Sequence, residues 1–338
     1  MKNKINNKFK YIFLIVVFVC STYILKNNMM DICRQLNKIS FSGIVSILIL
    51  SIGYSFIEGI NISVLSKKFK IKFNILSGVG CSFYTSFYKT VTFGSGSYVA
   101  SIYYLQNKGL SPSQSMGVCT LNYVFHRISI ALFSIICIIV NFNFIKFNFR
   151  NYLNIIKFVY IITILIVLFL IFICLSENFH KTILSIIKYI KTKFEINDKY
   201  KDKINYIEDE ILKIRNSSII ILQNKSTIAL EILLNLIKFL LIYLSSYVAL
   251  REMNISISII DALTTTSLAM ILAGSIPVPA GIASVEFIYT LLFSVIANNI
   301  SSASSMLIYR FSSFIFPFLV GWLYVIIVKI KNTLCYTK

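Results

Sequence analysis

The stretch Ala273-Gly274-Ser275-Ile276-Pro277-Val278-Pro279-Ala280-Gly281-Ile282-Ala283-Ser284-Val285-Glu286 interrupts a region that is apolar on both sides. Its two prolines and two glycines do not continue a helix, and the prolines cannot donate a backbone hydrogen bond. Inside a bilayer, such an interruption is tolerated only where protein buries it or water lines it. A broken helix beside an ionisable residue such as Glu286 is typical of substrate sites in transporters. The alternative is a tight turn between two ordinary spans, with Glu286 at the membrane interface.

The composition of the 338-residue chain places it in a membrane. Hydrophobic residues make up 57% of the sequence and charged residues 14%, whereas a soluble domain carries roughly a quarter charged residues. Several nearly uncharged runs are close to the length of about 20 residues that crosses the hydrocarbon as a helix. The runs are continuous and do not alternate as the strands of a membrane barrel do. The sequence therefore predicts an all-α, polytopic helical membrane protein.

Several other classes of function are excluded. The net charge of +20 does not indicate a nucleic-acid partner, because the basic residues fall between apolar runs, as in cytoplasmic loops. The seven cysteines form no C-x-x-C pair, and His126 and His180 have no metal-ligand spacing. No glycine-rich phosphate loop or serine–histidine–acid arrangement is present. We expect no catalytic residue, no metal and no cofactor.

Six full spans and three loops are expected from the apolar runs. The first span, 11–25, follows four lysines but no small-x-small cleavage site, so we interpret it as uncleaved. The long polar segment 176–226 carries Ile204, Ile207, Ile211 and Ile214 at helical spacing, which predicts an amphipathic helix that serves as a solvated linker or binds lipid. The other expected spans are 41–64, 116–142, 158–175, 227–250 and 305–328, and the expected loops are 106–115, 144–157 and 298–304.

Charged residues also occur within the expected spans. Glu58 lies near the lysine-rich end of its span, where it snorkels to the membrane interface, pairs with a lysine or has a functional role. Glu231, Asn235 and Lys238 are spaced by four and three residues, so they share one helix face. That face either points into the bundle or reaches the membrane interface at both ends.

The charge pattern predicts two hairpins of opposite orientation. If both termini and the basic segments 67–72 and 176–226 are cytoplasmic, 106–115 is cytoplasmic too. Segment 73–106 then enters and returns from inside, with Gly94–Ser97 at its tip, and 258–297 from outside, with Pro277–Gly281 at its tip. This predicts an inverted repeat of about 1–150 and 155–338 in one membrane domain, with 176–226 as a cytoplasmic linker. This topology places Lys146 and Arg150 outside, against the tendency of basic residues to lie in cytoplasmic loops. Hairpin arms of roughly 20 residues could cross the membrane fully or stop midway.

Four motifs resemble signatures of one family. Phe87-Tyr88-Lys89-Thr90-Val91-Thr92-Phe93-Gly94-Ser95-Gly96-Ser97, followed by Lys108-Gly109, resembles the first signature of the lysylphosphatidylglycerol synthetase/flippase membrane domain. Residues 277–286 resemble its second signature, with Ala280 where several members have glycine. Tyr309-Arg310 with Pro317 and Gly321 is similar to the third, and Arg127 matches an arginine of a fourth stretch.

The resemblance implies a flippase-like protein of a bacterial plasma membrane, with both termini cytoplasmic, that moves a phospholipid such as lysylphosphatidylglycerol between leaflets. In two-domain members a soluble domain transfers lysine to phosphatidylglycerol. This chain ends at Lys338, so we expect no such activity, although the family label would be phosphatidylglycerol lysyltransferase, with roles in lipid metabolism and antibiotic resistance. The alternative is an accessory subunit of an envelope-lipid enzyme. Such an enzyme or a second copy of the chain would be the protein partner.

The resemblance and the intramembrane charges together suggest a lipid site. Arg310, Arg127 and Lys89 are candidates for binding the lipid phosphate, because the guanidinium fork suits phosphate. Glu286 either faces a cationic headgroup or only pairs with Arg310 to hold two helices in register. The residues expected to shape the two breaks are Gly94, Gly96, Pro277, Pro279 and Gly281.

Overall fold

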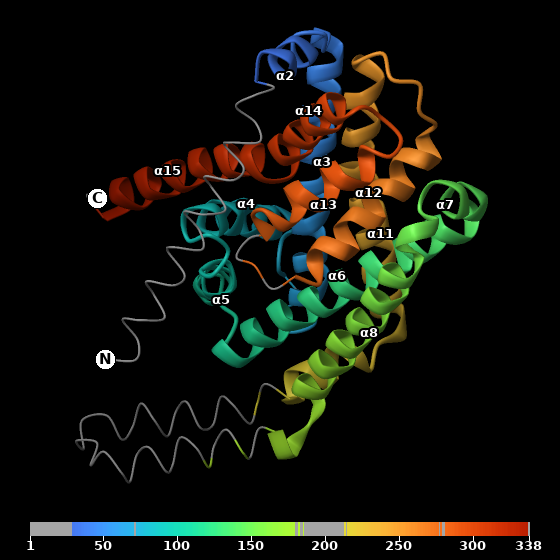
Figure 1. Ribbon diagram of the computed structural model, residues 1–338. Coiled ribbons are helices and arrows are strands. Elements are labelled where there is room, and N and C mark those ends of the chain that lie inside the picture. Colours follow the sequence, from blue (N-terminus) through green and yellow to red (C-terminus); the bar gives the residue numbers. More distant parts are fainter. Residues whose placement is uncertain are drawn as a thin grey trace, which may run out of the picture.

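The computed structural model describes residues 29–70, 72–179, 182, 185, 213, 215–276, 278 and 281–336. These residues form helices joined by short turns, with no strand among them (Figure 1), which confirms the predicted all-α class. The expected first span, 11–25, and the four isoleucines of the expected amphipathic helix lie outside the described residues.

The first half of the described chain begins with a short helix and contains one hairpin. Side chains cap several helix starts: Ser40, Asn74 and Ser111 accept hydrogen bonds from backbone amides of the first turns of α3, α4 and α6. The helices are α2 (Met29–Leu36), α3 (Phe41–Ser66), α4 (Ile75–Val91), α5 (Ser97–Asn107), α6 (Pro112–Val140), α7 (Phe142–Asn148) and α8 (Leu153–Leu175), with a 3₁₀ turn at Arg150–Tyr152.

The second half contains the other hairpin and ends in a long broken helix. Asn224, Ser258 and Asn298 cap α11, α12 and α14. A single π-helical stretch, Phe311–Ile315, separates the last two helices, and such π-turns often occur at functional sites. The helices are α11 (Lys225–Glu252), α12 (Ile259–Gly274), α13 (Ser284–Phe293), α14 (Asn299–Arg310) and α15 (Phe316–Tyr336).

Five segments of the described chain are long and apolar enough to cross a membrane. They are Phe41–Ser66, Pro112–Val140, Arg150–Ile173, Lys225–Glu252 and Asn299–Ile330. Leu165, Phe169 and Phe172 of α8 remain more than half exposed, as expected for side chains that face lipid tails instead of water. The polytopic class and five of the six expected spans are confirmed.

Two expected loops are wrong. Segment 144–157 contains α7, the 3₁₀ turn and the start of α8, because Ile145 and Phe149 are buried against the core and fold the segment onto it. Segment 298–304 is the start of α14, where the Asn298 side chain accepts a hydrogen bond of 2.7 Å from the Ser301 amide. Both loops were expected because polar residues interrupt the apolar runs there. In the first, core contacts outweigh that interruption, and in the second the polar residue is itself a helix cap.

The arms of both hairpins are too short to cross the hydrocarbon. Helices α4 and α5 have 17 and 11 residues, and α12 and α13 have 16 and 10. At about 1.5 Å per residue, the arms extend about 25, 16, 24 and 15 Å, less than the ~30 Å of a typical hydrocarbon core. Gly94 (φ 89°) and Gly281 (φ 66°) adopt left-handed backbone conformations in the two tips.

The hairpin helices and the helices on either side of them in sequence recur at a nearly constant separation. Equivalent helices begin 184 residues apart for the first two pairs and 187 apart for the last two: Phe41 and Lys225, Ile75 and Ile259, Ser97 and Ser284, Pro112 and Asn299. Their packing is also reciprocal. Helix α6 packs on α12 and α15 packs on α4, while α3 and α11 pack on each other near the centre of the bundle (Figure 1). The first hairpin packs on α3 through α4, and the second packs on α11 through α12.

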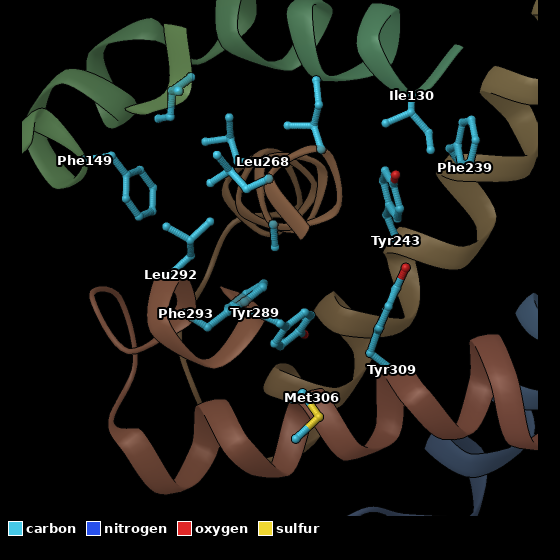
Figure 2. Close-up of a cluster of buried hydrophobic side chains, with 14 of the residues drawn as sticks. Ile130, Phe149, Phe239, Tyr243, Leu268, Tyr289, Leu292, Phe293, Met306 and Tyr309 are labelled. Carbon is cyan, nitrogen blue, oxygen red and sulfur yellow. The ribbon is translucent and has the colours of Figure 1, made fainter. Parts of the chain in front are cut away.

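A cluster of aromatic side chains fixes the second hairpin. Figure 2 shows Tyr289 and Phe293 of α13 between α12 and Tyr309 of α14. The Tyr289 ring centroid lies 4.3 Å from that of Phe293 and 5.5 Å from that of Tyr309, and all three rings are buried. Stacked rings of this size contribute large apolar contact areas in a core.

Candidate functional site

The tips of the two hairpins meet around one cavity of about 770 Å³. Its wall includes Thr92, Phe93 and Gly94 from the first tip and Ile276 and Gly281 from the second. The interrupted backbone therefore borders a cavity, the setting in which a membrane protein tolerates it.

Arg310 joins the second tip to the helix that follows it. Its Nε and Nη2 donate hydrogen bonds of 2.7 and 2.9 Å to the two carboxylate oxygens of Glu286, and Nη2 also donates one of 2.6 Å to the Gly281 carbonyl. This two-pronged geometry makes a strong charge-assisted pair. Arg310 is the last residue of α14, directly before the π-helical stretch Phe311–Ile315.

Arg127 contacts the beginning of the same tip from α6. Its Nη1 donates a 3.2 Å hydrogen bond to the carbonyl of Gly274, the last residue of α12, and its Nε donates one of 2.9 Å to the Tyr123 hydroxyl. Two arginines from different helices thus bind carbonyls on either side of 275–280. Pro277 and Pro279, which we expected to shape the break, lie outside the described residues.

Lys89 approaches the same cavity from the first hairpin. It lies in the last turn of α4, and its ammonium is 5.9 Å from the ring centroid of Phe314. Within the described chain, no carboxylate lies at ion-pair distance from it. The fold therefore brings Arg310, Arg127 and Lys89 to one cavity wall.

The first tip is closed by its own backbone and side chains. The Gly94 amide donates to the Lys89 carbonyl at 2.6 Å, and the Gly96 amide donates to the Thr92 hydroxyl at 2.8 Å. Gly94 lines the cavity, whereas Gly96 does not. A Cβ atom on Gly96 would come within 2.8 Å of Thr92, so the tight turn requires a glycine at this position.

A buried polar network connects α3, α6 and α11 beside the cavity. The Lys238 ammonium donates to Glu58 Oε2 at 2.7 Å and lies 3.0 Å from His126 Nδ1, and it also donates to the Asn235 side chain. Asn122 donates to the other Glu58 oxygen at 2.8 Å. The lysine partner of Glu58 is therefore within the bundle and is not one of the nearby loop lysines.

The polar stripe on α11 faces the bundle interior. Glu231, Asn235 and Lys238 are all 0% exposed, so the interfacial alternative for Glu231 and Lys238 is wrong. Among the described residues, neither carboxylate oxygen of Glu231 has a hydrogen-bond partner. The spacing of these residues identified the stripe, but no sequence signal linked it to Glu58, Asn122 and His126, which therefore were not predicted as site residues.

A second cavity of about 440 Å³ adjoins the first. Both are lined by Tyr54, Lys89, Tyr123 and His126. The smaller cavity extends between the arms of the first hairpin, where serine and threonine side chains line its wall beside Glu58. Within the described chain, no three His, Cys, Asp or Glu side chains are arranged to hold a metal ion.

Comparison with known proteins gives one family. Residues 10–321 match the protein family described as "Lysylphosphatidylglycerol synthase TM region". No curated protein matches the chain.

Proposed function

The chain belongs to the lysylphosphatidylglycerol synthase transmembrane family, and from this premise we propose that it moves a phosphate-bearing lipid between the leaflets of a bacterial plasma membrane. The observation that carries the proposal is the convergence of Lys89, Arg127 and Arg310 on one cavity at the meeting point of two hairpin tips. Three cations of this kind suit a lipid phosphate.

The arginines retain capacity for a ligand after their structural bonds are counted. Among the described residues, Arg310 uses Nε and Nη2, which leaves Nη1, and Arg127 uses Nε and Nη1, which leaves Nη2. Each guanidinium can therefore hold the hairpin tip and still donate to a phosphate oxygen. The structural pair and the lipid site, which we treated as alternatives for Glu286 and Arg310, are compatible.

The repeated helix order supports a transport mechanism. We propose that the two sets of four helices form an inverted repeat, with the hairpins entering from opposite sides and both termini in the cytoplasm. In transporters built this way, the site lies at the repeat interface and the repeats rock around it. The headgroup would occupy the cavity while the acyl chains stay in the bilayer.

The orientation of the hairpins is tested at their bases. Leu76 and Ile260 lie in the first turns of α4 and α12 and are 71% and 48% exposed. In a cysteine-free background, single cysteines at these positions should be labelled by an impermeant thiol reagent from opposite faces of the membrane. Labelling of both from one face would disprove the inverted repeat.

The transport proposal is tested in proteoliposomes. Dithionite quenches fluorescent phosphatidylglycerol in the outer leaflet only, so the protein should raise the quenched fraction above half. Arg310→Ala and Arg127→Ala should each lower the exchange rate by about tenfold, because a charge-assisted bond to phosphate contributes about 1.5–3 kcal/mol. Arg150→Ala, in the 3₁₀ turn away from both cavities, is the matched control.

Two results would contradict the proposal. Absence of exchange across a panel of phospholipids and polyprenyl phosphates would favour an accessory subunit. Appearance of lysylated lipid in a host that lacks it, detected by mass spectrometry, would favour a transferase.

A further inference from the structure

The smaller cavity differs chemically from the larger one. Hydroxyl-bearing residues dominate its polar wall: Ser82, Thr85, Ser86, Thr90, Ser97 and Ser101. They come from both arms of the first hairpin, and Thr85 and Ser101 bond to each other across it at 2.8 Å. The cavity therefore has a polar wall that is mainly uncharged.

Three of these hydroxyls already donate their protons to the backbone. Ser86 donates to the Ser82 carbonyl at 2.9 Å, Thr90 to the Ser86 carbonyl at 3.2 Å, and Ser97 to the Gly94 carbonyl at 2.8 Å. A hydroxyl that has donated its only proton still has an oxygen that can accept. The wall thus favours a ligand group that donates hydrogen bonds.

The charges around the cavities disfavour a donor that is itself cationic. Among the described residues, Glu58 is the one carboxylate that lines either cavity, and its charge is matched by Lys238 at 2.7 Å. Lys89 lies on the walls of both cavities, and Arg127 and Arg310 lie on the larger one, where Glu286 matches the charge of Arg310. The charges of Lys89 and Arg127 have no carboxylate at ion-pair distance among the described residues. An ammonium group on the headgroup would meet a net positive field, and like charges at close range are costly.

We infer that the ligand is an anionic lipid whose phosphate is followed by an uncharged, polyhydroxyl headgroup. The phosphate binds Arg127 and Arg310 in the larger cavity, and the headgroup hydroxyls donate to the serine and threonine oxygens of the smaller one. Lys89, between the two, excludes headgroups that carry an ammonium group. This inference rests on the proposed lipid transport and specifies its substrate class, and the headgroup is either a glycerol or a sugar-like ring.

The exchange assay distinguishes these substrates with five labelled lipids. Phosphatidylglycerol and phosphatidylinositol represent the two polyhydroxyl sources, phosphatidic acid supplies phosphate alone, and phosphatidylethanolamine and lysylphosphatidylglycerol carry ammonium groups. We expect one or both polyhydroxyl lipids to exchange at least about tenfold faster than the ammonium-bearing lipids. The faster of the two polyhydroxyl lipids identifies the headgroup source.

Lys89→Glu tests the selectivity directly. Reversing this charge should reverse the preference, so that lysylphosphatidylglycerol exchanges faster than phosphatidylglycerol. Lys146→Glu, an equal charge change on the exposed side of α7, should leave the preference unchanged. If Lys89→Glu is not recovered as folded protein, Lys89→Gln should reduce the preference without reversing it.

The hydroxyl wall is tested with the double variant Ser86→Ala/Thr90→Val. It should lower exchange of the preferred polyhydroxyl lipid by about fivefold, because two hydrogen-bond acceptors are lost. Exchange of phosphatidic acid should stay unchanged, because the variant removes no contact with the phosphate. Ser46→Ala, on an exposed face of α3, is the control.

The outcomes separate the two proposals. If no lipid exchanges, the proposed transport fails. If lipids exchange but lysylphosphatidylglycerol or phosphatidylethanolamine is preferred, or if headgroup has no effect, transport stands and the inferred substrate class is overturned.

Discussion

The first hairpin, α4–α5, and the second, α12–α13, have arms of similar length but are held by different contacts. Helix α4 packs directly on the backbone of α3: a Cβ atom on Gly78 would lie 2.1 Å from the Gly59 carbonyl oxygen. Helix α12 has Ala262 at the position equivalent to Gly78, and α11 has Tyr243 at the position equivalent to Gly59. The second hairpin is instead packed through aromatic side chains (Figure 2).

The cavity chemistry shows the same contrast between similar backbones and different side chains. Each cation around the larger cavity has an uncharged residue at its equivalent position: Lys89 and Ala273, Arg310 and Tyr123, Arg127 and Phe314. The two sets of helices thus share an arrangement but not their charges, since the three cations come from both sets and none has a charged counterpart in the other. In the proposed transport mechanism, an asymmetric site between two similar sets of helices would present one headgroup to both sides of the membrane.

The largest effect should come from the glycine contact that only the first hairpin has. Gly78→Ala forces a methyl group against the Gly59 carbonyl oxygen and the Ser63 hydroxyl of α3. The backbone oxygen cannot move aside, so the change should cost about 4 kcal/mol, which is exceptional for one methyl group. Thermal unfolding in detergent, followed by size-exclusion chromatography, measures the loss.

Gly53→Ala is the matched control for this glycine contact. Its added methyl group would lie 3.1 Å from the flexible Leu241 side chain, so we expect little change in melting temperature. Equal losses for the two variants would show that close backbone packing does not distinguish the hairpins.

The next effect concerns the buried pair at the centre of the bundle. Lys238→Met removes the partner of Glu58 and leaves a carboxylate that is 24% exposed without its cation, which should cost about 3 kcal/mol. The double variant Glu58→Gln/Lys238→Met should recover most of that loss. Additive losses in this thermodynamic cycle would contradict a direct pair.

The pair that anchors the second hairpin should contribute less. Glu286 and Arg310 side chains are 28% and 13% exposed, so we expect about 2 kcal/mol for Arg310→Gln and recovery in Glu286→Gln/Arg310→Gln. Recovered folding without lipid exchange would separate the binding role of Arg310 from its structural role. Recovered exchange would assign the pair to structure alone.

The smallest effect should come from Glu231. Its oxygens have no partner among the described residues, so Glu231→Gln replaces a costly buried acid with a neutral group of equal shape. We expect a change of less than about 1 kcal/mol, in the direction of greater stability. A loss above 2 kcal/mol, by the same unfolding assay, would show that the carboxylate has a partner after all. Asn235→Ala provides the contrast, since Asn235 bonds Lys238 and the Glu231 carbonyl.

Much of the fold was predictable because it depends on local properties. The length of an apolar run decides whether a helix can span the membrane, and glycine and proline mark where a helix breaks. The two hairpins and five spans followed from these signals. The loops 144–157 and 298–304 were mispredicted because Ile145, Phe149 and Asn298 act through burial and capping, which hydropathy does not register.

The candidate site was only partly predictable for the same reason. Arg310, Arg127 and Lys89 were identified as charges within apolar runs or as family motifs, and the fold brings them to one cavity. Glu58, Asn122 and His126 were not selected as site residues, because their significance depends on Lys238, 112 to 180 residues away.

By itself, the sequence determined that this protein is a helical membrane protein of a known family, where its helices break, and which spans carry charge. Only the structure decided which charges meet, that both tips line one cavity, and that the hairpin helices are shorter than a typical hydrocarbon core is thick. Hydropathy is a property of one continuous run of about 20 residues, and helix breaking acts over one or two turns of chain. Pairing across a bundle depends on the rotation of each helix about its axis, and side-chain packing throughout the core decides that rotation.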